Sequence, residues 1–123
     1  MLGRLAEWVN GDAVLVRRGR SLTARILVES GAQSWLIHVA EGRVARVEEG
    51  PFTMPSWTFA LRADGESWRR FWAARPAPGD HDLLALVRRG VLRLEGDLRP
   101  LFAHLLYVKG LMEAPRRAAL ASS

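Results

Sequence analysis

The chain has 123 residues, a formal net charge of +5 and no cysteine. This length suits one domain that buries its own core without cross-links. The lack of cysteine excludes disulfides, thiolate metal sites and cysteine nucleophiles. Glu7 lies where the apolar part of a signal peptide would be, and no apolar run approaches the roughly 18 residues of a membrane span. We therefore expect a cytoplasmic protein.

The positive charge comes almost entirely from arginine, with Lys109 as the one lysine. Many arginines are dispersed as pairs with acidic residues between them: Arg17/Arg18, Arg69/Arg70, Arg88/Arg89 and Arg116/Arg117. A solvated arginine-rich surface explains this pattern. Transient contact with an anionic membrane surface is kept as an alternative. Nucleic acid is not favoured, since no fingerprint of a nucleic-acid-binding module accompanies the charge.

The first half of the chain predicts a short helix followed by strands. Residues 2–9 have an amphipathic helical pattern that ends at Asn10-Gly11, and residues 13–18 fit either a first strand or an extension of this helix. Strand-like alternation of apolar and polar residues then recurs at 22–29, 34–40, 43–48 and 57–61. Glycine-containing turns separate the first three of these strands, which favours an antiparallel meander.

The pattern becomes helical at Asp64, which is a good N-cap residue. Trp68, Phe71 and Trp72 follow at helical spacing. Asp80 is placed to cap a second helix after a proline-rich loop. Strands in the first half and helices in the second indicate an α+β domain, with one antiparallel five-stranded sheet and helices packed on one face.

Residues 91–112 combine a short strand pattern with a long apolar helix. Gly96 ends the alternation and Asp97 can cap the helix that follows. Apolar residues then recur at helical spacing: Leu98, Leu101, Phe102, Leu105, Leu106, Val108 and Met112. This is more apolar surface than one contact stripe requires, so the remainder must meet a core, a partner or a bound apolar molecule. Ala114-Pro115 ends the helix, and residues 116–123 are expected to form a flexible tail after a single domain at 1–115.

The sequence offers no catalytic constellation and no metal-ligand spacing, so we expect neither an enzyme nor a cofactor. The isolated His104 lies within the apolar helix. It fits a histidine at the edge of the core with a satisfied hydrogen bond, a polar group that orients a ligand, or a catalytic base. The aromatic residues between 57 and 72 have two interpretations as well. They form either the packed core between one strand and one helix or the wall of an apolar cavity.

The order of elements resembles the sterol carrier protein type-2 domain family, from about Leu5 to Ala114. The residues that carry the resemblance are the strand-to-helix junction at Leu92, Leu94, Glu95, Gly96, Asp97 and Leu98, and the acidic-capped helix with Trp68, Phe71 and Trp72. Domains of this family bind lipids in an apolar tunnel between sheet and helices. The chain does not end in the peroxisomal address Ser-Lys-Leu. This favours a bacterial stand-alone relative that handles fatty acyl chains or isoprenoid quinones.

The resemblance implies non-catalytic binding or transfer of a lipid or another apolar molecule in a hydrophobic cavity. The expected cavity-facing residues are Trp57, Phe59, Trp68, Phe71, Trp72, Leu84, Phe102, Leu105, Leu106 and Met112. Two other functions stay open on the residues alone. The apolar C-terminal helix could serve as a protein-interaction or homodimer face without any cavity, or His104 could act in a small enzyme on an apolar substrate.

Overall fold

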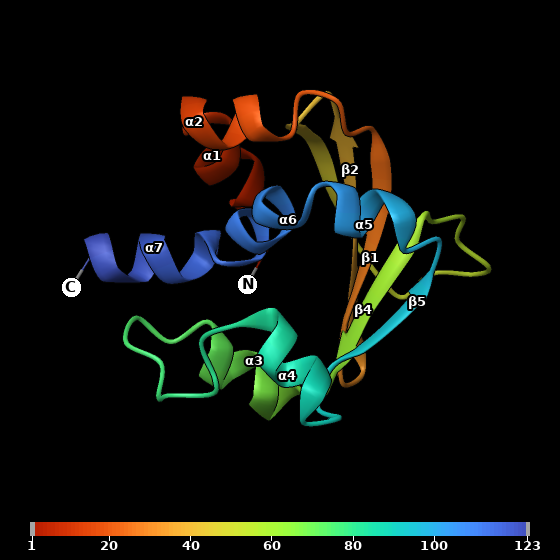
Figure 1. Ribbon diagram of the computed structural model, residues 1–123. Helices are drawn as coiled ribbons and strands as arrows, with labels where there is room; N and C mark the ends of the chain where they lie inside the picture. The colour runs from red at the N-terminus through yellow and green to blue at the C-terminus, as the bar shows by residue number, and fades with distance from the viewer. Residues whose placement is uncertain (1, 123) are drawn as a thin grey trace.

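The computed structural model describes residues 2–122, which form seven helices and five strands (Figure 1). In chain order these elements are α1 (Leu5–Asn10), α2 (Ala13–Arg18), β1 (Ala24–Ser30), β2 (Gln33–Ala40), β3 (Arg43–Glu49), β4 (Phe59–Ala63), α3 (Gly65–Phe71), α4 (Leu83–Arg88), β5 (Arg93–Gly96), α5 (Arg99–Ala103), α6 (Leu105–Met112) and α7 (Ala114–Ala121). The α+β class and the five-stranded sheet are as the sequence predicts.

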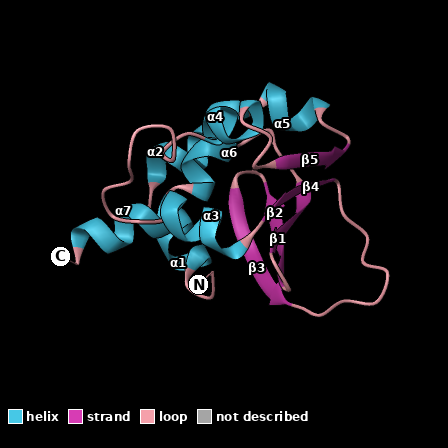
Figure 2. Cartoon of the chain, turned by 90° about the horizontal axis from the view of Figure 1, so that it is seen from below, coloured by secondary structure: helices cyan, strands magenta, loops and turns pink. Residues whose placement is uncertain are grey.

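The sheet is mixed, which corrects the antiparallel prediction. Its strand order is β3-β2-β1-β4-β5, and β1 pairs with β4 in parallel while the other pairs are antiparallel. β1 to β3 form the expected meander. Residues 50–58 then swing out beside the sheet as a long loop (Figure 2). Because this loop returns the chain to the end of the sheet where β1 starts, β4 runs in the same direction as β1.

Strand alternation divides the sheet into two faces of different character. The inner face carries fully buried apolar side chains such as Ile26, Ile37 and Leu61, which belong to one core together with residues of the helices. On the outer face, Leu27 lies between its register partners Leu36 and Ala60. These three form a separate small cluster beneath Phe52 and Trp57. The helices thus cover the inner face, and the loop at 50–58 covers part of the outer one (Figures 1 and 2).

The sequence predicts some helix starts and misses others. Asp64 caps α3 as expected, since its Oδ1 accepts from the Ser67 amide at 2.6 Å. α4 is capped by Asp82 and not by Asp80, because Asp82 Oδ2 accepts from the Ala85 amide at 3.2 Å. Residues 13–18 form the helix α2 rather than a strand, and Asp12 caps it through the Leu15 amide.

The long helix predicted after Asp97 is two helices, because His104 interrupts it with φ −124° and ψ 39°. The chain turns at this point, and α6 directs Tyr107, Val108 and Leu111 into the core. Residues 114–121, most of which fall in the predicted flexible tail, form the helix α7. Arg116 fastens α7 to α3, since its Nε and Nη2 donate to the Phe71 carbonyl at 3.0 and 2.7 Å.

Candidate functional site

A cluster of aromatic side chains fills the space between the sheet and α3. Trp68 stacks on Trp72 with ring centroids 4.9 Å apart, and Phe71 meets Trp68 edge-on at 5.6 Å. Trp35 of β2 meets Trp72 edge-on at 6.3 Å. All four side chains are buried. Large side chains therefore span the gap between the two layers and make its surface apolar.

Hydrogen bonds fix the two stacked indoles at both ends of the cluster. Trp68 Nε1 donates to the Glu29 carbonyl at 2.8 Å, and Trp72 Nε1 donates to the Met112 carbonyl at 2.9 Å. The first bond joins α3 to β1 and the second joins it to the end of α6. Because backbone carbonyls satisfy both N–H groups, neither Trp68 nor Trp72 offers a free indole N–H to a molecule that enters the cluster.

A depression of about 300 Å³ lies where α5 meets α6, and we call it the α5–α6 depression. Its lining residues are Arg18, Phe102, Ala103, His104, Leu105, Leu106 and Tyr107. Phe102 is 52% exposed and Leu106 is 66% exposed. The depression is open to solvent and leads inward to the buried Tyr107.

His104 lies half-buried in this depression and holds the helix break together. Its Nδ1 is 3.0 Å from the carbonyl oxygen of Pro100. A carbonyl oxygen only accepts, so Nδ1 carries the proton and donates this bond. The structure thus shows the satisfied hydrogen bond expected of a histidine at the core edge. Nε2 is the nitrogen that remains to meet a polar group of a ligand.

Tyr107 forms the floor of the same depression. Its hydroxyl donates to the Gly42 carbonyl at 2.8 Å, which ties α6 to the turn between β2 and β3. Burial raises the pKa of the Tyr107 hydroxyl above its usual range, because the phenolate would lose its hydration. The ring packs so closely on Gly19 that a Cβ there would lie 2.4 Å from it.

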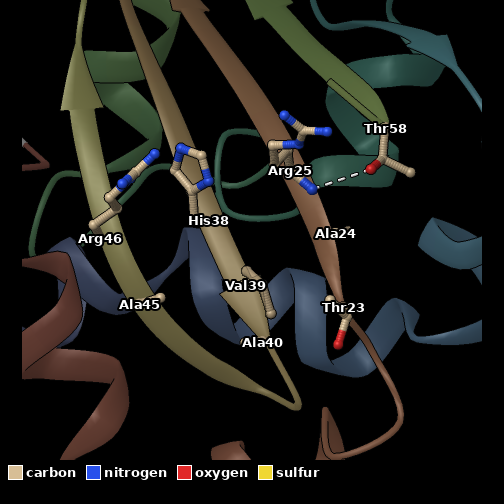
Figure 3. Close-up of a pocket in the computed structure, with 9 residues that line it drawn as sticks. All are labelled: Thr23, Ala24, Arg25, His38, Val39, Ala40, Ala45, Arg46 and Thr58. Atoms are coloured by element: carbon tan, nitrogen blue, oxygen red, sulfur yellow. Dashed lines mark hydrogen bonds between the residues drawn. The ribbon is translucent and has the colours of Figure 1, made fainter. Parts of the chain in front are cut away.

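A second depression, of about 510 Å³, lies on the outer face of the sheet (Figure 3). Figure 3 shows Arg25, His38 and Arg46 on three neighbouring strands that line it. His38 and Arg46 both contact Glu48, and the hydrogen bond from His38 lowers the pKa of that carboxyl. The site is polar, and the helix layer lies on the opposite side of the sheet.

Neither depression contains an arrangement typical of catalysis or metal binding. Within residues 2–122, no group of three or more histidine, aspartate or glutamate side chains is placed to hold a metal ion. None of the helices in that range is both long and apolar enough to cross a bilayer. The features that remain are the buried aromatic cluster and the exposed apolar side chains at the helix break.

Comparisons with known proteins agree with this geometry. No protein-family model matches the chain, and no curated protein matches its sequence. Solved structures do match, beginning with a crystal structure of sterol carrier protein 2. It aligns with a TM-score of 0.74 at 14% identity, over 91% of this chain and 90% of that one. The chain has the sterol carrier protein 2 fold.

Two further structures support the same assignment of the fold. The conserved hypothetical protein TT1886 from Thermus thermophilus aligns with a TM-score of 0.70 at 13% identity, over 95% of this chain and 85% of that one. A ubiquinone synthesis protein, UbiJ-SCP2, aligns with a TM-score of 0.58 at 17% identity, over 92% and 85% of the two chains. The resemblance found in the sequence is thus confirmed for the fold of nearly the whole chain.

Within this sterol carrier fold, the ten predicted cavity residues separate into four groups. Five lie in the main core between sheet and helices: Phe59, Trp68, Phe71, Trp72 and Met112. Leu105 packs half-buried against that core, whereas Phe102 and Leu106 are exposed beside the α5–α6 depression. Leu84 is half-buried on α4. Trp57 lies on the outer face against Arg62, 5.6 Å from ring centroid to guanidinium carbon, and so belongs to the other side of the sheet.

Two residues of the site are missing from the sequence prediction. Trp35 completes the aromatic cluster from β2, and Tyr107 forms the floor of the α5–α6 depression. Trp35 could have been found, because it shares the inward alternation of Ile37 and Val39. Tyr107 could have been found from helical spacing. Once the helix restarts after His104, its buried side is formed by Tyr107, Val108, Leu111 and Met112.

Proposed function

We propose that this protein binds a lipid or another apolar molecule without chemical conversion, between the helix layer and the inner face of the sheet. The α5–α6 depression is its entrance. The observations that carry the proposal are the buried aromatic cluster of Trp35, Trp68, Phe71 and Trp72 between sheet and α3, and the separate α5–α6 depression, which exposed apolar side chains rim. The sterol carrier fold supports the same function.

The aromatic cluster is tightly packed without a ligand, and this is what a ligand site that closes when empty would show. On a scale of about 24 cal/mol per Å³, a permanent void of about 300 Å³ would cost about 7 kcal/mol. That is comparable with the whole stability of a domain, so a site of this kind must close or stay filled. A twelve-carbon chain gains roughly 9 kcal/mol from burial at 0.8 kcal/mol per methylene, before ordering costs. A fatty acyl or isoprenoid chain therefore supplies enough free energy to displace packed side chains.

An interaction module built on the C-terminal helix has less support. α6 buries Tyr107, Val108, Leu111 and Met112 in the core of its own chain. On α5 and α6, the apolar side chains that remain for a partner are the exposed Phe102 and Leu106, and Leu120 of α7 is 46% exposed. Most of the apolar surface that suggests a partner in the sequence is thus explained by packing within one molecule.

The test uses tryptophan fluorescence with a brominated fatty acid, which quenches only those indoles that it contacts. We expect quenching that is largely lost when the three indoles of the cluster, Trp35, Trp68 and Trp72, are all replaced by phenylalanine. The matched control is Trp57→Phe, which removes an indole on the outer face of the sheet and should leave the quenching of the others intact. Organic extraction of the purified protein, followed by lipid mass spectrometry, identifies the natural ligand class.

The proposal is wrong if no acyl chain or quinone quenches any indole and extraction yields no lipid. Quenching that disappears in Trp57→Phe and persists without Trp35, Trp68 and Trp72 would move the site to the outer face. Either outcome is distinct from unfolding, which circular dichroism reports for each variant.

A further inference from the structure

Three basic side chains form a row across the outer face of the sheet. His38 of β2 is the register partner of Arg25 on β1 and of Arg46 on β3. All three line the depression of about 510 Å³ on this face, which we call the outer-face depression (Figure 3). Opposite charges at facing strand positions stabilise a sheet, whereas like charges destabilise it. A row without an acidic member gains nothing from such pairing, so the stability of the sheet does not explain it.

The carboxylate of Glu48 compensates only part of this positive charge. It lies 2.5 Å from His38 Nε2 and 3.4 Å from Arg46 Nη2. The Arg46 and Glu48 side chains are 66% and 44% exposed, so their ion pair holds the guanidinium only weakly. Arg25 forms no ion pair with any residue from 2 to 122. No acidic side chain of that range lines the depression, which leaves two guanidinium groups available to an anion.

A β-bulge in β3 shapes the outer-face depression. The register shifts between His38 and Val39, so that Ala45 lies between the paired Val44 and Arg46 without a register partner of its own. Val44 is buried on the inner face, whereas Ala45 and Arg46 both line the depression. Bulges re-aim side chains and are common beside functional sites. Here the bulge turns Arg46 toward the depression and places only a methyl group beside it.

Two hydroxyl groups add neutral donors to the same lining. Thr58 Oγ1 accepts from the Arg25 amide at 3.0 Å, as Figure 3 shows, and Thr23 Oγ1 accepts from the Glu41 amide at 3.2 Å. A hydroxyl carries one hydrogen that it can donate in addition to the bonds that its oxygen accepts. Neither hydroxyl donates to another group within residues 2–122, so both hydrogens are left for a bound molecule.

We propose that the outer-face depression binds a small, water-soluble phosphate ester. The guanidinium groups of Arg25 and Arg46 meet its phosphate from two strands, and the two threonine hydroxyls donate to the same group. Arginine suits phosphate because its planar set of N–H groups can reach two oxygens at once. The volume of about 510 Å³ lies within the range of small-molecule sites, so an organic group fits beside the phosphate, next to Ala40 and Ala45.

Other anions fit the outer-face depression less well. A carboxylate has two oxygens for the four donor groups, whereas the phosphate of an ester offers three strong acceptors. A single-stranded nucleic acid also carries phosphates, but proteins bind such strands with aromatic side chains on which the bases stack. No phenylalanine, tyrosine or tryptophan of the described chain lines the depression. The donor set therefore favours a small phosphate ester over both.

The experiment is isothermal titration calorimetry of the full chain with phenyl phosphate. We expect saturable binding, and binding about tenfold weaker or more for benzoate and for phenol, which lack the phosphate. Arg25→Gln and Arg46→Gln should each weaken binding about tenfold, because each removes a charge-assisted hydrogen bond. Ala45→Leu should abolish binding without any change of charge, since the larger side chain fills the depression.

Matched controls lie on the helices. Arg17 of α2 and Arg88 of α4 are exposed and make no ion pair among the described residues, so Arg17→Gln and Arg88→Gln remove the same charge elsewhere. Ala119→Leu adds the same side-chain volume at an exposed position of α7. All three controls should bind phenyl phosphate as the parent chain does. Urea denaturation verifies that every variant is folded.

Three outcomes would overturn the proposal. Phenyl phosphate could fail to bind, benzoate could bind equally well, or the Arg17 and Arg88 controls could lose as much affinity as the variants of Arg25 and Arg46. A single-stranded oligonucleotide is the further arm of the test. If it binds through Arg25 and Arg46 while phenyl phosphate does not, the site belongs to a polymer and the proposal is wrong.

The proposed lipid function does not depend on this second site. The aromatic cluster lies between the inner face of the sheet and α3, whereas the outer-face depression opens on the opposite side. Quenching by the brominated fatty acid should therefore be the same in the parent chain and in the Arg25→Gln/Arg46→Gln variant. Failure of phosphate binding would leave lipid binding standing, and the reverse holds as well.

Discussion

The side-chain amide of Asn10 forms hydrogen bonds with the free edge of β3, an edge strand of the sheet. Its Nδ2 donates to the Val44 carbonyl at 2.9 Å, and the Val44 amide donates to its Oδ1 at 2.8 Å. These two bonds imitate a strand pair on β3, which has no neighbouring strand on that side among the described residues. They satisfy backbone groups that would otherwise be open to edge-to-edge association.

Asn10→Ala should lower the free energy of unfolding by about 1–3 kcal/mol, because a part-buried donor and acceptor of Val44 both lose their partner. Urea denaturation measures the change. Gln33→Ala is the control, since it removes an exposed amide at the start of β2. Equal stability of the two variants would contradict the role given to Asn10.

Tyr107 predicts a dependence of stability on alkaline pH. It is the one tyrosine of the chain, and burial raises its pKa in the folded state. In the unfolded chain the hydroxyl ionises near its ordinary pKa of about 10. Above that pH the unfolded state binds fewer protons than the folded state, so stability falls as pH rises. Below it, the contribution of Tyr107 is fully present.

Tyr107→Phe should cost about 1 kcal/mol at neutral pH, through loss of the bond to Gly42. This deficit should shrink above about pH 10, because the variant lacks the ionisable group. Urea midpoints of both proteins at neutral and alkaline pH make the comparison, and all other titrating groups are shared. A deficit that stays constant across this range would show that Tyr107 ionises equally in both states.

Among the secondary-structure elements, α6 has a buried side and an exposed side, and mutations on these two sides should differ in their effect on stability. Leu111 is fully buried in the core, whereas Leu106 is 66% exposed, although both belong to the same apolar run. The helix break at His104 sets this division, since it fixes which side of α6 turns inward.

Leu111→Ala should lower the free energy of unfolding by about 2–5 kcal/mol, since it leaves a cavity in the core. Leu106→Ala is the matched control and should change stability by no more than about 0.5 kcal/mol. Thermal or urea denaturation measures both. Similar losses at the two positions would mean that α6 is rotated relative to the arrangement described above.

The whole molecule should respond to apolar ligands as a unit, because the proposed site lies between its two layers. A ligand at a hundred times its Kd stabilises the folded state by about 2.7 kcal/mol. At roughly 4 °C per kcal/mol for a domain of this size, Tm should rise by about 10 °C. Affinity should increase about fourfold for each added methylene until the chain fills the site. Differential scanning fluorimetry across a series of fatty acids checks both, and a shift that does not depend on chain length would contradict burial between the layers.

Much of the fold could be predicted from local sequence signals. The strands at β1, β2 and β3, the turn at Gly42 and the cap at Asp64 follow from alternation and from residue chemistry within a few positions. Trp68, Phe71 and Trp72 share one helical stripe, so their joint burial was predictable too. The sequence alone thereby determined the α+β class, the meander and the aromatic residues of α3.

Tertiary structure decided what depends on contacts between distant residues. Local alternation does not encode on which side of β1 the next strand pairs, so the parallel placement of β4 was not predictable. The same holds for Trp57, whose strand-like position hides that it faces Arg62 on the outer side. The helix break at His104 is held by Pro100 and accompanied by the bond from Tyr107 to Gly42, 65 positions away in the chain. Periodicity shows which residues prefer burial, but only packing between the layers decides which of them are buried and which remain exposed.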